Sequence, residues 1–136
     1  MKSVAVFGAF DILHPGHKAF LNQAAALGDK LTVYLALDEI IVELKGREPV
    51  QEFKVRKAAL EALTDVDEVQ KGDHVLGNYR GISISQPDAI VLGYDQGELE
   101  KDLKRWMKKF RIEIPIIHTE SFHPETYKTS KLRENI

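Results

Sequence analysis

The sequence contains no cysteine, which excludes disulfide bridges, thiolate metal ligands and thiol nucleophiles. It has no apolar run long enough to cross a membrane, and the apolar stretch near its start is too short for a secretion signal. Neither sign of charge dominates, because 19 Lys and Arg side chains stand against 21 Asp and Glu, a net charge of -2. We therefore expect a cytoplasmic protein that binds neither nucleic acid nor membranes.

The sequence does contain enough apolar material for one packed core. Of its 136 residues, 43% are hydrophobic and 29% are charged. This length fits one domain, and no repeat, low-complexity tract or linker divides it. We predict a single domain over residues 1–136.

Short apolar runs alternate with longer amphipathic stretches, which is typical of strands joined by crossover helices. Strands are expected at residues 4–7, 31–37, 67–70, 89–92 and 114–117, and helices at 15–27, 51–63 and 97–110. Pro115 favours an edge position for the last strand, because proline cannot donate to a strand ladder. The pattern predicts an α/β sandwich with helices packed on a parallel sheet of five strands.

The segment between the first expected strand and the first expected helix has the character of a phosphate-binding loop. Gly8 would let the chain leave the strand in an unusual conformation, and Gly16 would let a ligand approach the backbone. Pro15 suits the first turn of a helix. His14 and His17 would then lie at the helix N-terminus, where unpaired N–H groups and the helix dipole favour anions. Alternatively, one histidine caps the helix and the other packs.

This loop has neither the Walker A pattern nor the Gly-x-Gly-x-x-Gly pattern, which disfavours classical kinases and dehydrogenases. Its pattern is Gly-x-Phe-Asp-x-x-His-x-Gly-His, formed by Gly8, Phe10, Asp11, His14, Gly16 and His17. That pattern resembles the signature of the cytidylyltransferase-like nucleotidyltransferases, which have a Rossmann-like α/β fold. Further segments resemble the family in the same order, at residues 45–49, 56, 92–96 and 128–131.

The resemblance implies transfer of a nucleoside monophosphate from a nucleoside triphosphate to a phosphate-bearing acceptor, with release of pyrophosphate. The implied catalytic residues are His14, His17 and Lys45. The implied nucleotide-binding residues are Gly8, Ala9, Phe10, Asp11, His14, Pro15, Gly16, His17, Gly93, Asp95, Tyr127, Thr129 and Ser130. Additional phosphate contacts are expected from Arg56, Lys128 and Lys131. The acceptor phosphate is already a dianion at neutral pH, so the reaction needs no strong general base.

Three of these roles remain open at the level of sequence. Arg56 either reaches a phosphate or pairs with Glu52, one helical turn away. Asp11 fits an orienting role better than direct phosphate contact, because two anions repel. Asp38 either orients a loop or acceptor, or caps a helix. The resemblance also implies Mg²⁺ held mainly by phosphates rather than by a protein metal site, and a homodimer.

The acceptor is suggested by the tail and by two loops. Residues 123–129 lack the arginine of the family's glycerol-phosphate and choline-phosphate branches. Residues 45–47, 93–96 and 127–128 resemble the archaeal FAD synthases, which transfer AMP from ATP to FMN. The alternatives are a CTP-dependent enzyme acting on glycerol 3-phosphate or a sugar phosphate, and a nucleotide-binding module without turnover. A flavin needs an apolar, aromatic-lined cleft, for which the candidates are Tyr79, Tyr94, Phe122 and Tyr127.

Overall fold

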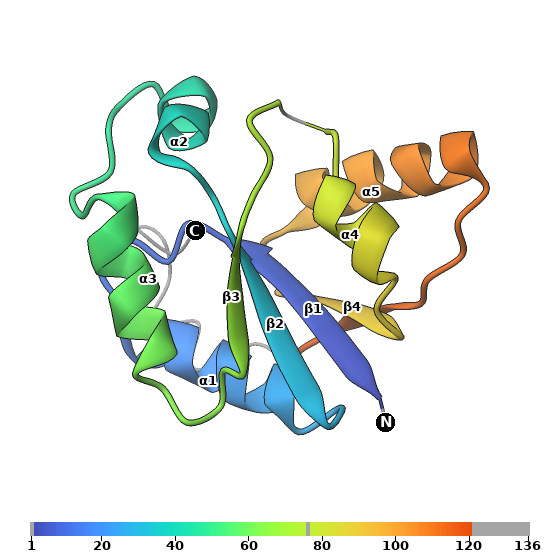
Figure 1. Ribbon diagram of the computed structural model, residues 1–136, viewed down its shortest axis with the longest axis horizontal. Helices are drawn as coiled ribbons and strands as arrows, with labels where there is room; N and C mark the ends of the chain where they lie inside the picture. The colour runs from blue at the N-terminus through green and yellow to red at the C-terminus, as the bar shows by residue number, and fades with distance from the viewer. Residues whose placement is uncertain (1, 76, 121–136) are drawn as a thin grey trace.

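One parallel sheet organises the chain. The structure is a computed structural model and describes residues 2–75 and 77–120. Its strands are β1 (Ser3–Gly8), β2 (Lys30–Leu35), β3 (Glu68–Lys71), β4 (Ala89–Leu92) and β5 (Ile116–His118). They form a five-stranded sheet in the order β3-β2-β1-β4-β5, and every neighbouring pair is parallel (Figure 1).

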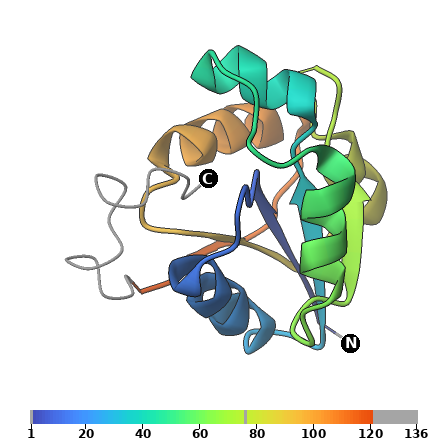
Figure 2. The same cartoon turned by 90° about the vertical axis from the view of Figure 1, so that its left-hand side faces the viewer.

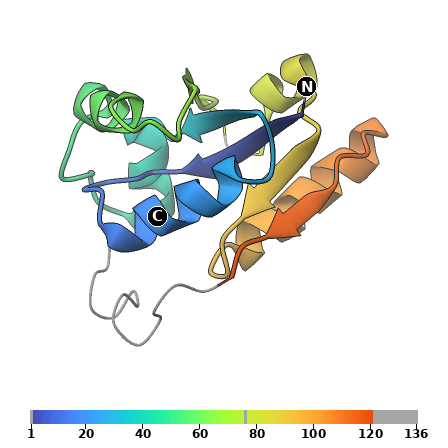
Figure 3. The ribbon, with the colours of Figure 1, turned by 90° about the horizontal axis from the view of Figure 1, so that it is seen from below.

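Helices cover both faces of this sheet. They are α1 (Pro15–Ala25), α2 (Asp38–Lys45), α3 (Phe53–Glu61), α4 (Arg80–Ser85) and α5 (Gly97–Phe110). Leu21 of α1 and Leu60 of α3 belong to one core cluster, whereas Ile82 of α4 and Leu103 of α5 belong to another. Successive strand residues point to opposite faces, so the two clusters lie on opposite sides of the sheet. Figures 2 and 3 show α1 and α5 on different sides, which confirms the predicted sandwich.

The strands and the three long helices match the sequence prediction within a few residues. The fifth strand lies at an edge of the sheet, as expected. It begins at Ile116, just after Pro115, rather than at residue 114. Two helices, α2 and α4, were not predicted from the sequence pattern. The first had visible signals, since Asp38 and Glu39 lie in its first turn and Gly46 follows its last residue with φ 73°. Acidic residues at the start and a left-handed glycine after the end are common helix boundaries.

The strand order creates a switch point between β1 and β4. The chain passes from β1 to β2 and β3 on one side of the sheet, then crosses to β4 and β5 on the other. The connections after β1 and β4 therefore diverge, and open parallel sheets bind ligands in the crevice that results. Over residues 2–75 and 77–120, no helix combines the length and apolar character needed to span a membrane.

Candidate active site

The predicted loop leaves β1 at this switch point and continues into α1. Phe10 is fully buried and has a φ of 47°, and Ile12 has a φ of 62°. Side chains other than glycine rarely adopt this left-handed conformation, and such strain is concentrated at functional sites. Gly8 plays a different part from the one predicted. A Cβ on Gly8 would lie 2.7 Å from the Phe10 ring, so the glycine provides the space that lets this ring pack.

His14 caps α1 directly. Its Nδ1 accepts hydrogen bonds from the backbone N–H groups of Gly16 (3.1 Å) and His17 (3.3 Å). The two N–H groups are therefore not unpaired, which corrects the prediction that they await an anion. Because Nδ1 acts as an acceptor, a neutral His14 carries its proton on Nε2. The cap thus makes Nε2 the donor that the imidazole can offer to a phosphate oxygen.

The two histidines of the motif are brought together. Their rings stack with centroids 3.7 Å apart and an interplanar angle of 21°. His17 is only 3% exposed and meets the Phe10 ring edge-on at 5.4 Å. The loop conformation and the aromatic packing therefore fix both imidazoles relative to each other. Preorganised donors of this kind are what stabilises a charge that develops during a reaction.

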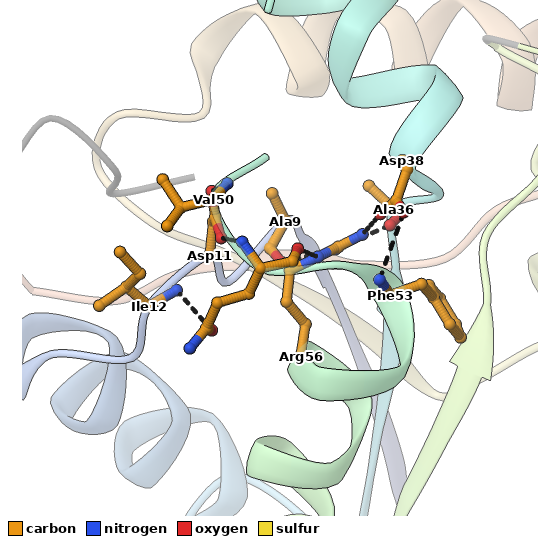
Figure 4. Close-up of polar contacts among 9 residues, drawn as sticks. Ala9, Asp11, Ile12, Ala36, Asp38, Val50, Phe53 and Arg56 are labelled. Atoms are coloured by element: carbon orange, nitrogen blue, oxygen red, sulfur yellow. Dashed lines mark hydrogen bonds and ion pairs between the residues drawn. The ribbon is translucent and has the colours of Figure 1, made fainter. Parts of the chain in front are cut away.

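Arg56 lies beneath three of the loops, fully buried (Figure 4). Its guanidinium donates to the backbone oxygens of Ala9 (2.9 Å), Ala36 (2.8 Å) and Gln51 (2.9 Å), and it forms an ion pair with Asp38. These partners come from the loops after β1 and β2 and from the loop between α2 and α3. The structure therefore gives Arg56 a part that neither predicted alternative described, since it ties the loops of the site together.

Asp11 extends the same network from the loop between Gly8 and His17, which we call the histidine loop (Figure 4). Its buried carboxylate accepts hydrogen bonds from the backbone N–H groups of Val50 (2.7 Å) and Gln51 (2.8 Å). In return, the Gln51 side chain accepts a hydrogen bond from the Ile12 N–H at 3.1 Å. Asp11 thus fixes the loop that follows Lys45, which agrees with the orienting role suggested by its charge. Lys45 is exposed and is the last residue of α2.

The turn after β4 contains Gln96, which belongs to the family-like segment 92–96 but was not among the predicted site residues. Gln96 is buried; its Oε1 accepts from the Gly93 N–H at 2.9 Å, and its Nε2 donates to the Phe7 carbonyl at 3.0 Å. The amide therefore joins the ends of β1 and β4 across the switch point. Asp95 is exposed at the tip of this turn. Gln96 is the last residue of the family-like segment 92–96, so the motif itself was the available signal, whereas its burial and its hydrogen bonds are visible only in the structure.

A cavity of about 540 Å³ lies beside this turn, within the usual size range of small-molecule sites. Its walls come from the ends of β1 and β2, from α2, from the segment between β3 and α4, and from the start of α5. Lys45, Gly8, Ala9 and Asp95 are among the predicted site residues that line it. Most of the remaining lining is apolar, including Ile40, Ile41, Leu44, Val75, Ile82 and Leu99.

Three aromatic rings form one surface of the cavity, and they come from separate parts of the chain. Phe7 stacks on Tyr34 with centroids 5.5 Å apart and meets Tyr79 edge-on at 5.8 Å. We call these three residues the aromatic floor. Burial raises the pKa of Tyr34, and burial together with the Asp102 carboxylate raises the pKa of Tyr79 far above its usual range. Both hydroxyls therefore stay protonated in the folded protein.

Several predicted site residues lie outside the described part of the chain. They are Tyr127, Lys128, Thr129, Ser130 and Lys131. Phe122, a candidate for the flavin cleft, also lies outside it. Tyr94 is 52% exposed and is not part of the cavity lining. Of the two aromatic candidates that the structure describes, Tyr79 lines this cavity and Tyr94 does not.

Comparisons with known proteins give consistent results. The Cytidylyltransferase-like family matches residues 5–135. The FAD synthase of Thermococcus sibiricus is 39% identical over 134 residues, which cover 98% of this chain and 90% of that protein. The FAD synthase of Aciduliprofundum boonei is 37% identical over 122 residues, covering 90% of this chain and 80% of that protein.

A solved structure also resembles this chain over most of its length. It is described as the lipopolysaccharide core biosynthesis protein from Thermoplasma volcanium, with 32% identity and a TM-score of 0.80. The match covers 90% of this chain and 98% of that one.

Proposed function

Because this chain belongs to the cytidylyltransferase-like family, we propose that it is an FAD synthase, a nucleotidyltransferase that transfers AMP from ATP to FMN and releases pyrophosphate. Relatives of that name align with nearly the whole chain, as the 98% coverage by the Thermococcus sibiricus protein illustrates. The chain in turn covers 90% of that relative's length.

The observation that carries the choice of acceptor is the apolar cavity next to the histidine loop. Glycerol 3-phosphate and sugar phosphates offer almost no apolar surface, so they have nothing to bury against a wall built from Ile40, Leu44 and Val75. A flavin ring system buries apolar area against such a wall, and apolar burial is the main source of affinity in pockets of this kind. The cavity therefore supports FMN over the polyol and sugar phosphates.

The transfer forms a bond between an FMN phosphate oxygen and the α-phosphorus of ATP, and it breaks the bond from that phosphorus to the bridging oxygen of the leaving pyrophosphate. Most of the catalysis is positioning and charge stabilisation. In our proposal the His14 Nε2–H and His17 donate to the triphosphate and stabilise the negative charge at the transferring phosphorus. Lys45 approaches the phosphates from the end of α2. Asp11 and Arg56 hold the surrounding loops in place.

The nucleotide itself would lie along the switch point. The proposed contacts are the histidine loop, from Gly8 to His17, and the turn that contains Gly93 and Asp95. Tyr127, Thr129 and Ser130, with Lys128 and Lys131, remain proposed contacts from outside the described residues. Gln96 joins the list as a positioning residue, because it fixes the spacing between the two strand ends that flank the nucleotide.

We propose that Mg²⁺ enters this site as part of the substrate, held mainly by the phosphates. Among the described residues, no three His, Asp or Glu side chains gather into a metal-binding cluster. Mg²⁺ prefers oxygen ligands and usually keeps several waters while phosphates hold it. When bound in that way, the ion would neutralise charge on the triphosphate. The residues that would meet the complex are the donors described above.

The experiment that tests the function is a pyrophosphate-release assay with Mg²⁺. ATP and CTP are each combined with FMN, glycerol 3-phosphate and a sugar 1-phosphate, and the product is identified by chromatography. We expect pyrophosphate and FAD in equal amounts from ATP and FMN alone. Release with CTP and a polyol or sugar phosphate would overturn the proposed substrates. If nucleotide bound in every combination without release, the chain would be a binding module.

Two further features follow from the family resemblance alone. We propose a homodimer, as is common among small members of the family, and a cytoplasmic location in line with the use of ATP. Light scattering at working concentration tests the first, and cell fractionation tests the second. A monomer in the first experiment, or a membrane-bound protein in the second, would contradict these proposals.

A further inference from the structure

We propose that the isoalloxazine ring of FMN occupies the apolar cavity and packs against the aromatic floor of Phe7, Tyr34 and Tyr79. We also propose that Tyr79 is a positioning residue for the flavin, held in place by Asp102. This inference rests on the proposed function and assigns the part of the site that selects the acceptor. It places the ring on the sheet face covered by α4 and α5, which is opposite the face covered by α1.

The first support is the apolar rim of the cavity. Leu44 at the end of α2 and Val75 before α4 both line the cavity, and each is 63% exposed. Large apolar side chains that gather around a concave surface mark ligand or interaction sites. A planar ring system that enters between them would remove apolar area from water, and that would contribute affinity.

The second support is the fixed orientation of the two tyrosines. The Tyr34 hydroxyl is hydrogen-bonded to the Ser85 hydroxyl at 2.9 Å, and the Tyr79 hydroxyl donates to the Asp102 carboxylate at 2.5 Å. Both hydroxyls are thus committed to protein partners. The floor therefore offers aromatic ring surface rather than hydroxyl groups to a ligand. Aromatic rings pack well against other flat rings, in offset stacks or edge to face.

The third support is the backbone at Tyr79. This residue precedes α4 with a φ of 47°, a conformation that favours glycine or asparagine over an aromatic residue. Its ring packs edge-on against Phe7 and against Trp106, with centroids 5.4 Å apart in the latter pair. The strained backbone is thus retained where it brings a ring into the cavity. Such outliers are maintained when a function needs the geometry.

The position of the cavity also gives the ligand a direction. Gly8 and Ala9 line the cavity, and the same loop continues to His14. A flavin whose ring lies on the aromatic floor can direct its ribityl phosphate toward the loop that binds ATP. Asp95 and Gln96 border the cavity where it meets the switch point. The acceptor phosphate would reach the α-phosphorus of ATP there.

The first experiment measures flavin fluorescence during titration with the full-length protein, without ATP. Leu44→Asn and Val75→Asn remove apolar rim surface at exposed positions, so the fold should tolerate both. We expect each to weaken FMN and riboflavin binding by about three- to tenfold. Val42→Asn on the same helix as Leu44, and Val55→Asn on α3, are exposed controls outside the cavity. They should bind as the unchanged protein does.

Riboflavin separates ring recognition from phosphate recognition, because it carries the ring and no phosphate. We expect riboflavin to compete with FMN and not with ATP. Unchanged flavin affinity in both rim variants, or competition between riboflavin and ATP, would overturn the inference. The proposed function would survive that result if ATP and FMN still gave FAD. If FMN neither bound nor reacted while another acceptor did, the proposed function itself would fail.

A second experiment tests Tyr79 as a positioning residue. Tyr79→Phe keeps the ring and removes the hydrogen bond, while Asp102→Asn keeps an oxygen acceptor for the Tyr79 hydroxyl. We expect Tyr79→Phe to raise the KM for FMN by about two- to tenfold with the KM for ATP unchanged. The KM for FMN of Asp102→Asn should remain near that of the unchanged protein. Asp102→Ala should raise this KM as much as Tyr79→Phe does, and combining the two substitutions should raise it no further. Equal changes in both KM values would refute a role toward the flavin.

Discussion

Replacing Arg56 by methionine tests whether this residue organises the site. The substitution removes the donors that reach the carbonyls of Ala9, Ala36 and Gln51 and the carboxylate of Asp38. Each buried acceptor that loses its donor costs about 1–3 kcal/mol. The Asp38 side chain is 40% exposed, so water can replace the guanidinium there. The three carbonyl acceptors together therefore predict that the free energy of unfolding falls by about 3–9 kcal/mol.

Urea denaturation followed by circular dichroism measures this loss. The free energy of unfolding of a small domain is only about 5–15 kcal/mol, so Arg56→Met could unfold the protein. Arg56→Lys provides a milder variant. Its ammonium keeps the charge and some of the bonds, so the loss should be about 1–3 kcal/mol. Lys57→Met is a control on the same helix, whose exposed ion pair with Glu61 is worth less than about 1 kcal/mol. If Arg56→Lys kept full stability and raised only the KM for ATP, Arg56 would bind phosphate instead of joining the loops.

Four further outcomes are expected. Asp11→Asn loses one of two hydrogen bonds from backbone N–H groups, so the free energy of unfolding should fall by about 1–2 kcal/mol. Faster proteolysis between α2 and α3 would show that the loop has been released. His14→Ala removes the helix cap and the Nε2 donor, so kcat should fall by about 10²–10³ while FMN titrations stay unchanged; a comparable loss of FMN binding would contradict the assignment. Gln96→Leu breaks the link between β1 and β4 and should lower kcat/KM for ATP by about tenfold or more; an unchanged value would rule out a positioning role. Because the folded pKa of Tyr79 is raised, its contribution to stability is complete below about pH 10 and declines above it, by about 1.4 kcal/mol per pH unit. Urea midpoints between pH 8 and 11 should show this decline, and Tyr79→Phe should reduce it.

The fold was largely predictable because its signals are local. The apolar residues of β1 and β4 and the spacing of Leu103, Trp106 and Met107 in α5 indicate element type within short windows. The short helix α4 carried no comparable signal. It has six residues and starts after Tyr79, whose backbone is left-handed. A helix this short gives no clear signal from helix propensity or from hydrophobic periodicity. Its position is set by packing, since Ile82 is buried against the sheet.

The site was predictable only in part, because its support comes from distant residues. The motif identified His14 and His17 as neighbours, and their rings do stack. For Arg56, the sequence suggested a phosphate contact or an ion pair with Glu52, one turn away. Its actual partners include Ala9 and Ala36, which are 47 and 20 residues away. Contacts of that range depend on which loops meet at the ends of parallel strands, and a linear pattern does not contain this information.

The candidate site is divided between the two faces of the sheet. The histidine loop leads into α1, and its supporting Arg56 lies on α3, both on one face of the sheet. The aromatic floor is built from Tyr34 and Tyr79 in the cluster of the opposite face. Under the proposed roles, changes to the floor should therefore alter the choice of acceptor without disturbing the donors assigned to ATP. Changes to the network around Arg56 should instead impair transfer to every acceptor, because they displace the loops that all of these reactions share.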